Sequence, residues 1–328
     1  MIAKKHLSIT KLAEYCGCSP STISRVFNGK TPVSPEKRDR ILRAAERFNY
    51  MPNLKTLQNT IALVVADRQG ITPPSWFACN MISNLLLVLS RRGYRVTLRR
   101  ISETSGLNPK EIVAGVLIDW NSSPAELKPL GRLKFPFVCI NLFMSGFNTV
   151  CSDHAGQMLT AVRYLLRAGH RRIVYLEPTA NNWGSSERRR GALYAFEEVG
   201  MSYDDSFTDV WNSDICMDRE KVGRMLAERK PTAIVCLSED WVLFLHQTLI
   251  SLGYNVGEDI SLVTSELSGI TDGLAPGLTV VKQDLDELAR ATLQMIENLE
   301  NNPPLMGGIN HCVVPCRLVE RNSVKKFK

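Results

Sequence analysis

The sequence predicts an α/β protein in two parts, an all-α helix-turn-helix headpiece at the N-terminus and a larger body of doubly wound parallel sheets. Three short helical patterns fill the first fifty residues, and strand-like apolar runs alternate with amphipathic helices in the rest. Hydrophobic residues make up 44% of the 328 positions and charged residues 22%, values that are typical of packed globular domains. A chain of this length is expected to form two or three domains.

The excess positive charge lies entirely in the N-terminal part of the chain. Residues 1–60 contain eleven Lys and Arg but only four Asp and Glu, and the net charge of the whole chain is +7, so the remainder is neutral overall. A compact basic module joined to a neutral body is typical of proteins that bind a polyanion. By itself, the charge would fit a merely solvated basic surface equally well.

Apolar residues at helical spacing, within 9–16, 23–27 and 41–48, predict three short helices. The second is expected to begin at Ser19-Pro20 and end at Asn28-Gly29, and the third to begin at Ser34-Pro35. Gly17 can supply the left-handed conformation that a tight turn after the first helix needs. Ser19 is a favourable N-cap for the second helix, and Pro20 suits its first position. Two helices joined by a short turn and closed by a third are typical of a helix-turn-helix.

The second helix leaves small and polar residues pointing outward near its start: Pro20, Ser21, Thr22 and Arg25. This half of a recognition helix reaches base edges in the major groove of DNA. Arg25 can donate to guanine O6 and N7, and Ser21 and Thr22 can bond bases or phosphates. The free amides at Ser19 can hold a phosphate. The pattern alone also fits a three-helix bundle with a solvated face.

Strand-like runs and helical stretches alternate through the body. The predicted strands are 61–66, 95–99, 115–119, 137–141, 172–177, 232–237 and 260–265, and the predicted helices lie near 77–92, 155–168, 186–199, 218–229, 240–252 and 284–299. This alternation is typical of parallel doubly wound sheets. The strands are too numerous for one compact sheet, so we expect two lobes with a ligand site in the cleft between them.

The composition indicates a cytoplasmic protein without a metal or cofactor. Nine cysteines are scattered over the chain, and the two close pairs, Cys16 with Cys18 and Cys312 with Cys316, have no partner pair at zinc-site spacing. No signal-peptide core follows the first residues, and no run of 18 apolar residues predicts a membrane span.

The headpiece sequence carries a family resemblance. Residues 12–29, LAEYCGCSPSTISRVFNG, resemble the DNA-binding headpiece of the lactose/galactose repressor (LacI/GalR) family, and residues 33–36 and 49–53 match the next landmarks of that family. The resemblance implies base-reading positions at Pro20, Ser21 and Arg25. It implies supporting contacts to the DNA backbone from Ser19, Ser24, Asn28 and Tyr50.

The linker departs from the family pattern. The headpiece is expected to end at residue 53, and residues 54–60 form a link that is several residues shorter than the usual hinge helix before a body at 61–328. Leu57 either wedges into a DNA base step or packs against the body. The shortening leaves open how the state of the body reaches the headpiece.

The resemblance continues through the body, in residues 153–156, 169–173, 188–191, 278–284 and 317–323. It implies two periplasmic-binding-protein-like subdomains, a homodimer that binds a near-palindromic operator, and a sugar or related polyol as effector. The leading interpretation is therefore a transcriptional repressor that is controlled by a small molecule. The rivals are a sugar-processing enzyme with a DNA-binding head and a DNA-binding protein without effector, and no Walker-type loop or nucleophile elbow supports the enzyme.

The resemblance also implies effector-binding positions. Arg188 matches an arginine that reaches ligand hydroxyls or carboxylates, for which a guanidinium is suited. Asp153 either accepts from ligand hydroxyls or caps its helix. Trp211 falls where relatives stack an aromatic ring on a sugar, although it can also be a core residue, and Gln283 matches a residue that borders the ligand.

The remaining effector positions match the family imperfectly. Glu239 and Asp240 stand where Asn-Asp is usual, and Glu266 stands where an aspartate is usual. Two carboxylates that face one arginine would fit a polyol or a ligand with an amine, and would argue against a phosphorylated effector. Trp76 and Phe77 either line the ligand site from the first lobe or belong to ordinary lobe packing.

Overall fold

The computed structural model describes residues 8–28, 33–48, 50, 59–67, 76–118, 124–178, 182–202, 208–211, 218–301 and 309–327. The chain divides into two compact units, Met1–Gln58 and Asn59–Lys328. We refer to these units as the headpiece and the body. Among the described residues, no helix combines the length and the apolar character that crossing a membrane requires.

The headpiece contains the three predicted helices, α1 (Ile9–Tyr15), α2 (Pro20–Asn28) and α3 (Pro35–Arg47). Gly17 has a φ of 58°, so it provides the left-handed turn between α1 and α2. One apolar cluster joins the helices, with Leu12, Ile23 and Ile41 fully buried at its centre. The amphipathic spacing of these residues turns one face of each helix to the common core.

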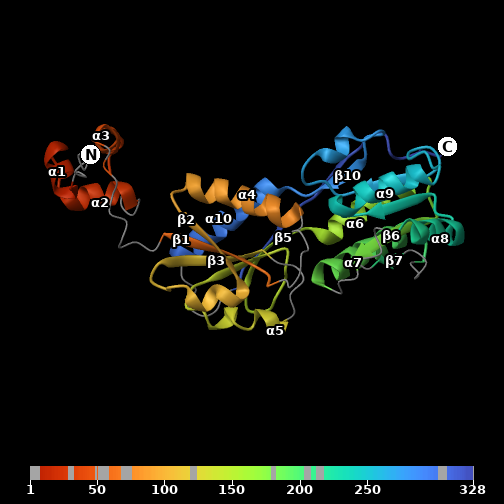
Figure 1. The fold of residues 1–328 in the computed structure, drawn as a ribbon, viewed down its shortest axis with the longest axis horizontal. Helices are drawn as coiled ribbons and strands as arrows, with labels where there is room; N and C mark the ends of the chain where they lie inside the picture. Colours follow the sequence, from red (N-terminus) through yellow and green to blue (C-terminus); the bar gives the residue numbers. More distant parts are fainter. Residues whose placement is uncertain are drawn as a thin grey trace. The chain divides into compact units, whose positions relative to one another are not determined.

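The first lobe of the body is built on a parallel six-stranded sheet in the order β11-β5-β4-β3-β1-β2 (Figure 1). Its strands are β1 (Thr60–Val65), β2 (Arg95–Arg100), β3 (Ile112–Ile118), β4 (Phe137–Ile140), β5 (Asn148–Ser152) and β11 (His311–Val314). Helices α4 (Trp76–Arg91) and α10 (Leu285–Asn301) pack on one face. The other face is covered by η1 (Ile101–Gly106), α5 (Pro124–Leu127) and η2 (Leu130–Arg132).

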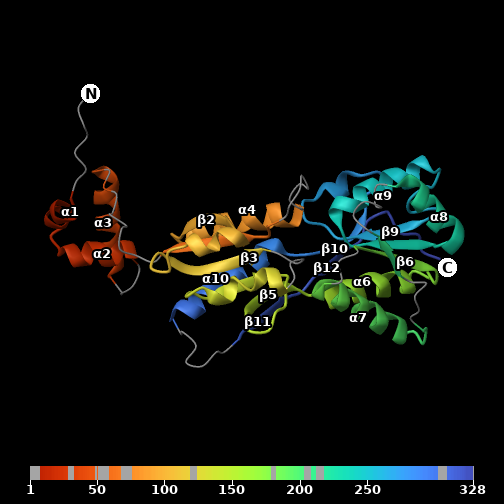
Figure 2. The same ribbon diagram turned by 60° about the horizontal axis from the view of Figure 1, so that its bottom comes forward.

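The second lobe is built on a six-stranded sheet in the order β12-β10-β9-β8-β6-β7. Its strands are β6 (Ile173–Pro178), β7 (Thr208–Trp211), β8 (Ala233–Cys236), β9 (Ser261–Thr264), β10 (Thr279–Lys282) and β12 (Arg317–Val319), with η3 (Ile270–Gly273) after β9. Helices α6 (His154–Arg167) and α7 (Trp183–Glu197) lie side by side on one face (Figure 2). Helices α8 (Arg219–Arg229) and α9 (Glu239–Ser251) cover the other.

The chain passes between the lobes three times. It crosses from β5 to α6, from β10 to α10, and from β11 to β12. Each sheet therefore takes its last strand from the C-terminal part of the chain, and β12 enters antiparallel to β10 while the other paired strands are parallel. The two-lobed α/β architecture predicted from the sequence is confirmed.

Five strands were not predicted from the sequence, namely β5, β7, β10, β11 and β12. They contain three to five residues each, and most carry polar or charged side chains, as in NTVCS for β5 and RLV for β12. Such short strands lack the apolar run or strict alternation that a pattern can detect. The six predicted helices of the body are all present, because each presents a long apolar face to a sheet.

Candidate nucleic-acid interface and effector site

The start of α2 is a cluster of exposed hydroxyls. Ser19 Oγ lies 2.7 Å from Ser21 Oγ and 2.9 Å from Thr22 Oγ1, and it accepts a hydrogen bond from the Thr22 amide at 3.2 Å. Ser19, Pro20, Ser21 and Arg25 are exposed, and Thr22 is half-buried. The N-terminal half of α2 therefore offers hydroxyls and a guanidinium to solvent on one side.

The opposite side of α2 fixes the helix in the headpiece. Ile23 and Val26 are buried, and the ring of Phe27 lies 5.9 Å from that of Tyr50. Tyr50 is itself buried, and burial raises the pKa of its phenol. Tyr50 thus lies in the headpiece core, where it packs against the buried face of α2.

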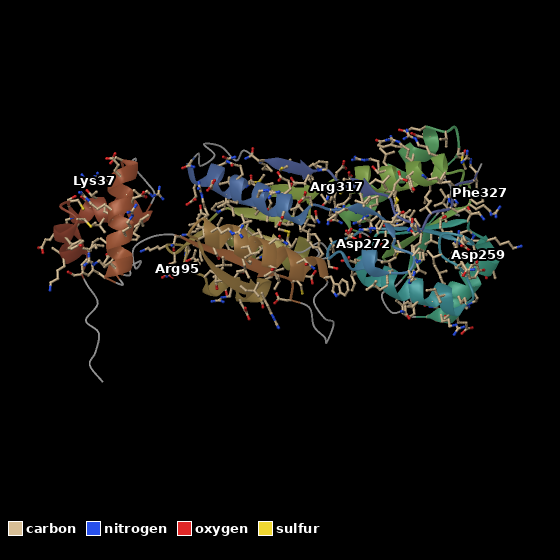
Figure 3. The ribbon with its side chains drawn as sticks, turned by 90° about the horizontal axis from the view of Figure 1, so that it is seen from above. Lys37, Arg95, Asp259, Asp272, Arg317 and Phe327 are labelled. Atoms are coloured by element: carbon tan, nitrogen blue, oxygen red, sulfur yellow. The ribbon has the colours of Figure 1, made fainter. Side chains whose placement is uncertain are left out.

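Two arginines of α3 hold the turn and the end of α1. Arg40 donates to the Cys16 carbonyl at 2.9 Å, and Arg47 donates to the Tyr15 hydroxyl at 3.1 Å. The other cationic side chains described on α3 stand exposed on the headpiece surface, with Lys37 visible in Figure 3; they are Lys37, Arg38 and Arg43. Leu57 and the side chain of Asn28 lie outside the described residues.

Asp153 caps α6 at the first crossover between the lobes. Its carboxylate accepts from the Gly156 amide at 2.7 Å, and a Cβ at Gly156 would lie 2.1 Å from the other carboxylate oxygen. The capping role that the sequence left open is therefore occupied in this structure. Cys316, at the third crossover, lies within electrostatic reach of Asp153 and Arg188, and burial raises the pKa of its thiol to about 12.

Arg188 on α7 contacts a histidine that the sequence analysis did not single out. Its Nη2 donates to His154 Nδ1 at 3.3 Å, and its Nε is buried without a hydrogen-bond partner among the described residues. Burial, and then the charge of Arg188, hold the pKa of His154 well below its usual value of 6.5. His154 is therefore neutral at pH 7 and accepts through Nδ1.

A line of aromatic rings runs from this histidine to the first lobe. The rings of His154 and Trp183 lie 5.5 Å apart edge to face, and those of Trp183 and Phe143 lie 6.0 Å apart in a stack. Phe143 in turn lies 4.7 Å from His311 on β11. Because Phe143 follows β4 and Trp183 begins α7, this line joins the two lobes.

Gln283 lies buried at the second crossover. Its Oε1 accepts from Ser152 Oγ at 2.9 Å and from Asn141 Nδ2 at 3.4 Å. Asn141 has a φ of 52°, and its Oδ1 accepts from the Ser152 amide at 2.7 Å. Gln283 thus ties the ends of β4 and β5 to the segment that leaves β10.

Glu239 and Glu266, the two carboxylates assigned to the effector site, have partners of their own inside the second lobe. Glu239 is buried and accepts from the amides of Leu267 and Ser268 at 3.0 to 3.2 Å. Glu266 is buried and pairs with Arg321 at 2.8 Å. Each carboxylate is satisfied inside the second lobe, because a buried charge needs partners close by.

The other four predicted effector residues are located on helices and a strand, but the structure describes few of their side-chain contacts. Trp76 and Phe77 form the first turn of α4, and Phe77 packs against the core of the first lobe. Trp211 ends β7, and Asp240 belongs to the first turn of α9, but their side chains lie outside the described residues.

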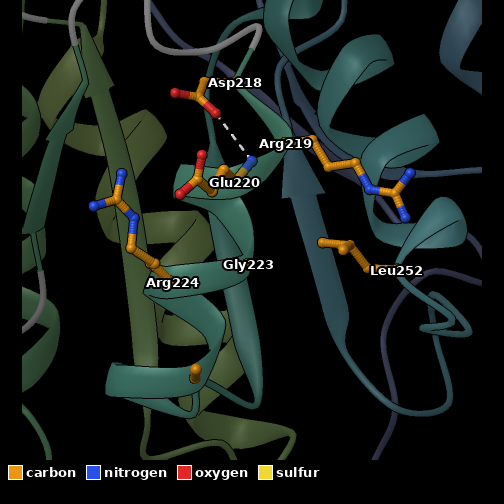
Figure 4. A pocket seen from close by; sticks show the side chains of 7 residues that line it. Asp218, Arg219, Glu220, Gly223, Arg224 and Leu252 are labelled. Carbon is orange, nitrogen blue, oxygen red and sulfur yellow. Dashed lines mark hydrogen bonds between the residues drawn. The ribbon is translucent and has the colours of Figure 1, made fainter.

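A surface groove of about 790 Å³ lies between α8 and α9 in the second lobe (Figure 4). Asp218 caps α8 there by accepting from the Glu220 amide at 2.9 Å, and Arg219 donates to the Ser251 carbonyl at 2.7 Å. Two of the charged groups on this groove, Asp218 and Arg219, are thus engaged in capping α8 and in bridging it to the end of α9. Its lining includes none of the predicted effector residues.

Residues 8–53 match the family described as bacterial regulatory proteins, lacI family, and residues 162–324 match the periplasmic binding protein-like domain. The HTH-type transcriptional regulator GalR of Escherichia coli (strain K12) is 26% identical over 335 residues, which cover 97% of this chain and 95% of GalR.

Two solved structures share the fold. The lac repressor dimer bound to operator and the anti-inducer ONPF has a TM-score of 0.71 at 18% identity, covering 98% of this chain and all of that one. The CelR–cellobiose complex has a TM-score of 0.71 at 22% identity, covering 97% of this chain and all of the other.

A three-helix headpiece with an exposed reading helix, on a body of two α/β lobes, defines a helix-turn-helix transcriptional regulator with a periplasmic-binding-protein-like body. The chain belongs to the LacI/GalR family of transcriptional regulators. Its relatives are DNA-binding regulators and not enzymes, so the family, fold class and regulatory function predicted from the sequence are confirmed.

Proposed function

We propose that this protein is a repressor that binds a near-palindromic operator as a homodimer, and that a sugar-like molecule held between the two lobes controls its affinity for DNA. In this proposal residues 1–53 are the part of the headpiece that binds DNA, 54–60 are a short hinge, and 61–328 are the effector-binding and dimerisation domain. The repressor acts in the cytoplasm, on the chromosome.

The observation that carries the DNA-binding part is the exposed N-terminal half of α2. Arg25 is exposed there beside the hydroxyls of Ser21 and Thr22, while Ile23 and Val26 hold the helix in the core. A guanidinium reads guanine through two hydrogen bonds, and hydroxyls contact bases or phosphates. The net charge of the headpiece strengthens binding to the phosphate backbone.

The homodimer is supported by apolar side chains on the outside of the first lobe. Leu86 and Leu87 on α4 are 40% and 54% exposed, and Leu98 on the edge strand β2 is 50% exposed. Exposed leucines on neighbouring elements favour an interface. The lac repressor, which shares this fold, is described as a dimer bound to operator. Two headpieces then fit half-sites about one helical turn apart.

The effector part is supported by the position of Arg188. It lies on the second lobe beside His154 and Trp183, at the start of a line of rings that reaches the first lobe. A ligand that binds Arg188 therefore lies close to side chains from both lobes, so its affinity depends on how the two lobes are arranged. Differential affinity for two lobe arrangements then changes the spacing of the headpieces.

The proposal is tested by fluorescence anisotropy with a DNA fragment from upstream of the protein's own gene. Arg25→Ala is expected to weaken specific binding by about 1–3 kcal/mol and to relax the preference for one sequence. Arg43→Ala removes the same charge from an exposed site on α3, and serves as the matched control. Equal effects of the two substitutions, or no preference of the wild type over unrelated DNA, would contradict the proposal.

A further inference from the structure

Arg188 is a cation for which the described residues provide no counter-ion. Among the described residues, no carboxylate lies within 4 Å of its guanidinium, and its one hydrogen bond goes to a neutral ring nitrogen of His154. Its Nε is buried and donates to no described group. An arginine is always charged, and a partly desolvated charge without a partner is unfavourable. The site therefore favours whatever brings a negative charge to it.

His154 does not supply that charge. Its ring is 5% exposed, and its Nδ1 accepts from Arg188, so the histidine is neutral in this contact. The low pKa that burial imposes on it keeps it neutral at pH 7. A neutral imidazole orients the guanidinium but leaves its charge uncompensated.

The three described carboxylates that the sequence assigned to the effector site have other partners. Asp153 caps α6 at the Gly156 amide, and Glu239 accepts from two backbone amides of the loop after β9. Glu266 accepts from Arg321 and from Thr271 Oγ1 at 2.6 Å, and lies 3.5 Å from Lys282 Nζ. The sequence argued against a phosphorylated effector because Glu239 and Glu266 were expected at the site, and in this structure both carboxylates have partners of their own.

We infer that the effector of this repressor is an acidic sugar derivative whose carboxylate or phosphate pairs with Arg188. This inference rests on the proposed function, because it names the chemical class of the molecule that binds at the proposed effector site. A guanidinium presents parallel donors in a fixed fork, which match the two oxygens of a carboxylate or phosphate. The anion compensates the charge of Arg188 and gives its buried Nε an acceptor.

The test is calorimetric titration of the full chain with matched compounds. Glucose, glucuronate and glucose 6-phosphate form one set, and galactose, galacturonate and galactose 6-phosphate form another. At least one acid is expected to bind more tightly than its neutral parent by ten-fold or more. Comparing the uronates with the phosphates then shows whether Arg188 pairs with a carboxylate or with a phosphate. Arg188→Gln should weaken that acid by about ten- to a hundred-fold and weaken the neutral parent by a clearly smaller factor. Arg224→Gln removes a positive charge from an exposed residue of α8, and it controls for the general effect of losing one charge.

The inference is overturned if neutral sugars bind as well as their acids, if Arg188→Gln and Arg224→Gln weaken the acid equally, or if none of the six compounds binds. Operator binding is measured on the same preparations. This measurement distinguishes failure of the proposed function from failure of the inference about the effector. An acid that binds through Arg188 without changing operator affinity supports the inference and contradicts the proposed control. A neutral sugar that releases DNA supports the proposed control and contradicts the inference.

Discussion

Two arginines of the second lobe, Arg321 and Arg188, differ in how far their charge is compensated. Arg321 pairs with Glu266 and with Asp272, each at 2.8 Å, and donates to the Leu278 carbonyl at 2.6 Å. Asp272, seen in Figure 3, reaches this arginine from η3. Within the part of the chain that the structure describes, Arg188 has one hydrogen bond, to a neutral histidine. The comparison teaches that a fully satisfied guanidinium holds the fold, whereas an incompletely satisfied one is available to a ligand.

The largest expected effect is the loss of Arg321. Arg321→Gln leaves the buried Glu266 carboxylate without its strongest partner, and removing one partner of a buried pair typically costs about 3–5 kcal/mol. We expect the free energy of unfolding of the body, measured by urea denaturation, to fall by about 3 kcal/mol. Arg321→Lys keeps the charge and should lose less. A change below about 0.5 kcal/mol for Arg321→Gln would contradict the claim that Arg321 stabilises the fold.

The same cluster should make stability depend on pH. Burial raises the pKa of Glu266, but hydrogen bonds from Thr271 and Arg321 and the charges of Arg321 and Lys282 together hold it below its usual value. Glu266 therefore stabilises the body above the unfolded pKa near 4.5, and this contribution is lost as pH falls through the lower pKa of the folded state. Its slope is at most about 1.4 kcal/mol per pH unit.

The pH dependence is measured as the free energy of unfolding between pH 3 and pH 7. Glu266→Gln should flatten the fall below about pH 4.5 relative to the wild type. Glu287→Gln changes an exposed carboxylate in an exposed pair and should leave the curve unchanged. Identical curves for Glu266→Gln and the wild type would show that this carboxylate does not stabilise the fold.

Arg188 should behave in the opposite way to Arg321. Arg188→Gln removes an uncompensated charge, so we expect the free energy of unfolding without ligand to stay constant or rise, by up to about 1 kcal/mol. Thermal unfolding of the free protein measures this change. A fall of several kcal/mol would place Arg188 with Arg321 among the residues that hold the fold.

The smallest expected effect concerns the aromatic line between the lobes. Phe143→Ala removes the stack with Trp183 and the contact with His311, and aromatic pairs contribute about 0.5–1.5 kcal/mol each. Phe143 is 45% exposed, so we expect a loss near the lower end, together with altered fluorescence of Trp183. Tyr194→Ala, at a residue of 47% exposure on α7, is the control. Unchanged fluorescence in Phe143→Ala would mean that the line does not join the lobes in solution.

The sequence predicted the headpiece and the rhythm of the body well, because long amphipathic helices leave a clear pattern. It missed the five short strands β5, β7, β10, β11 and β12. Several of them pair with neighbours that are distant in sequence, as β11 does with β5.

Sequence patterns carried less information about the site. Arg188 was found through the family resemblance, whereas His154, Trp183 and Phe143 come from three segments that meet only in the folded body. Glu266 was assigned to the ligand through the same resemblance. Its partner Arg321 lies 55 residues further along the chain, at a spacing that no local pattern reveals.

The central claim is that one part of the chain reads DNA and another reads an acidic effector. The most direct test is operator affinity, measured by anisotropy while the acid is titrated, for the wild type, Arg25→Ala and Arg188→Gln. The account predicts that Arg25→Ala loses specific DNA binding but keeps the acid, and that Arg188→Gln binds the operator normally but no longer responds to the acid. Normal operator binding by Arg25→Ala, or an undiminished response of Arg188→Gln, would contradict it.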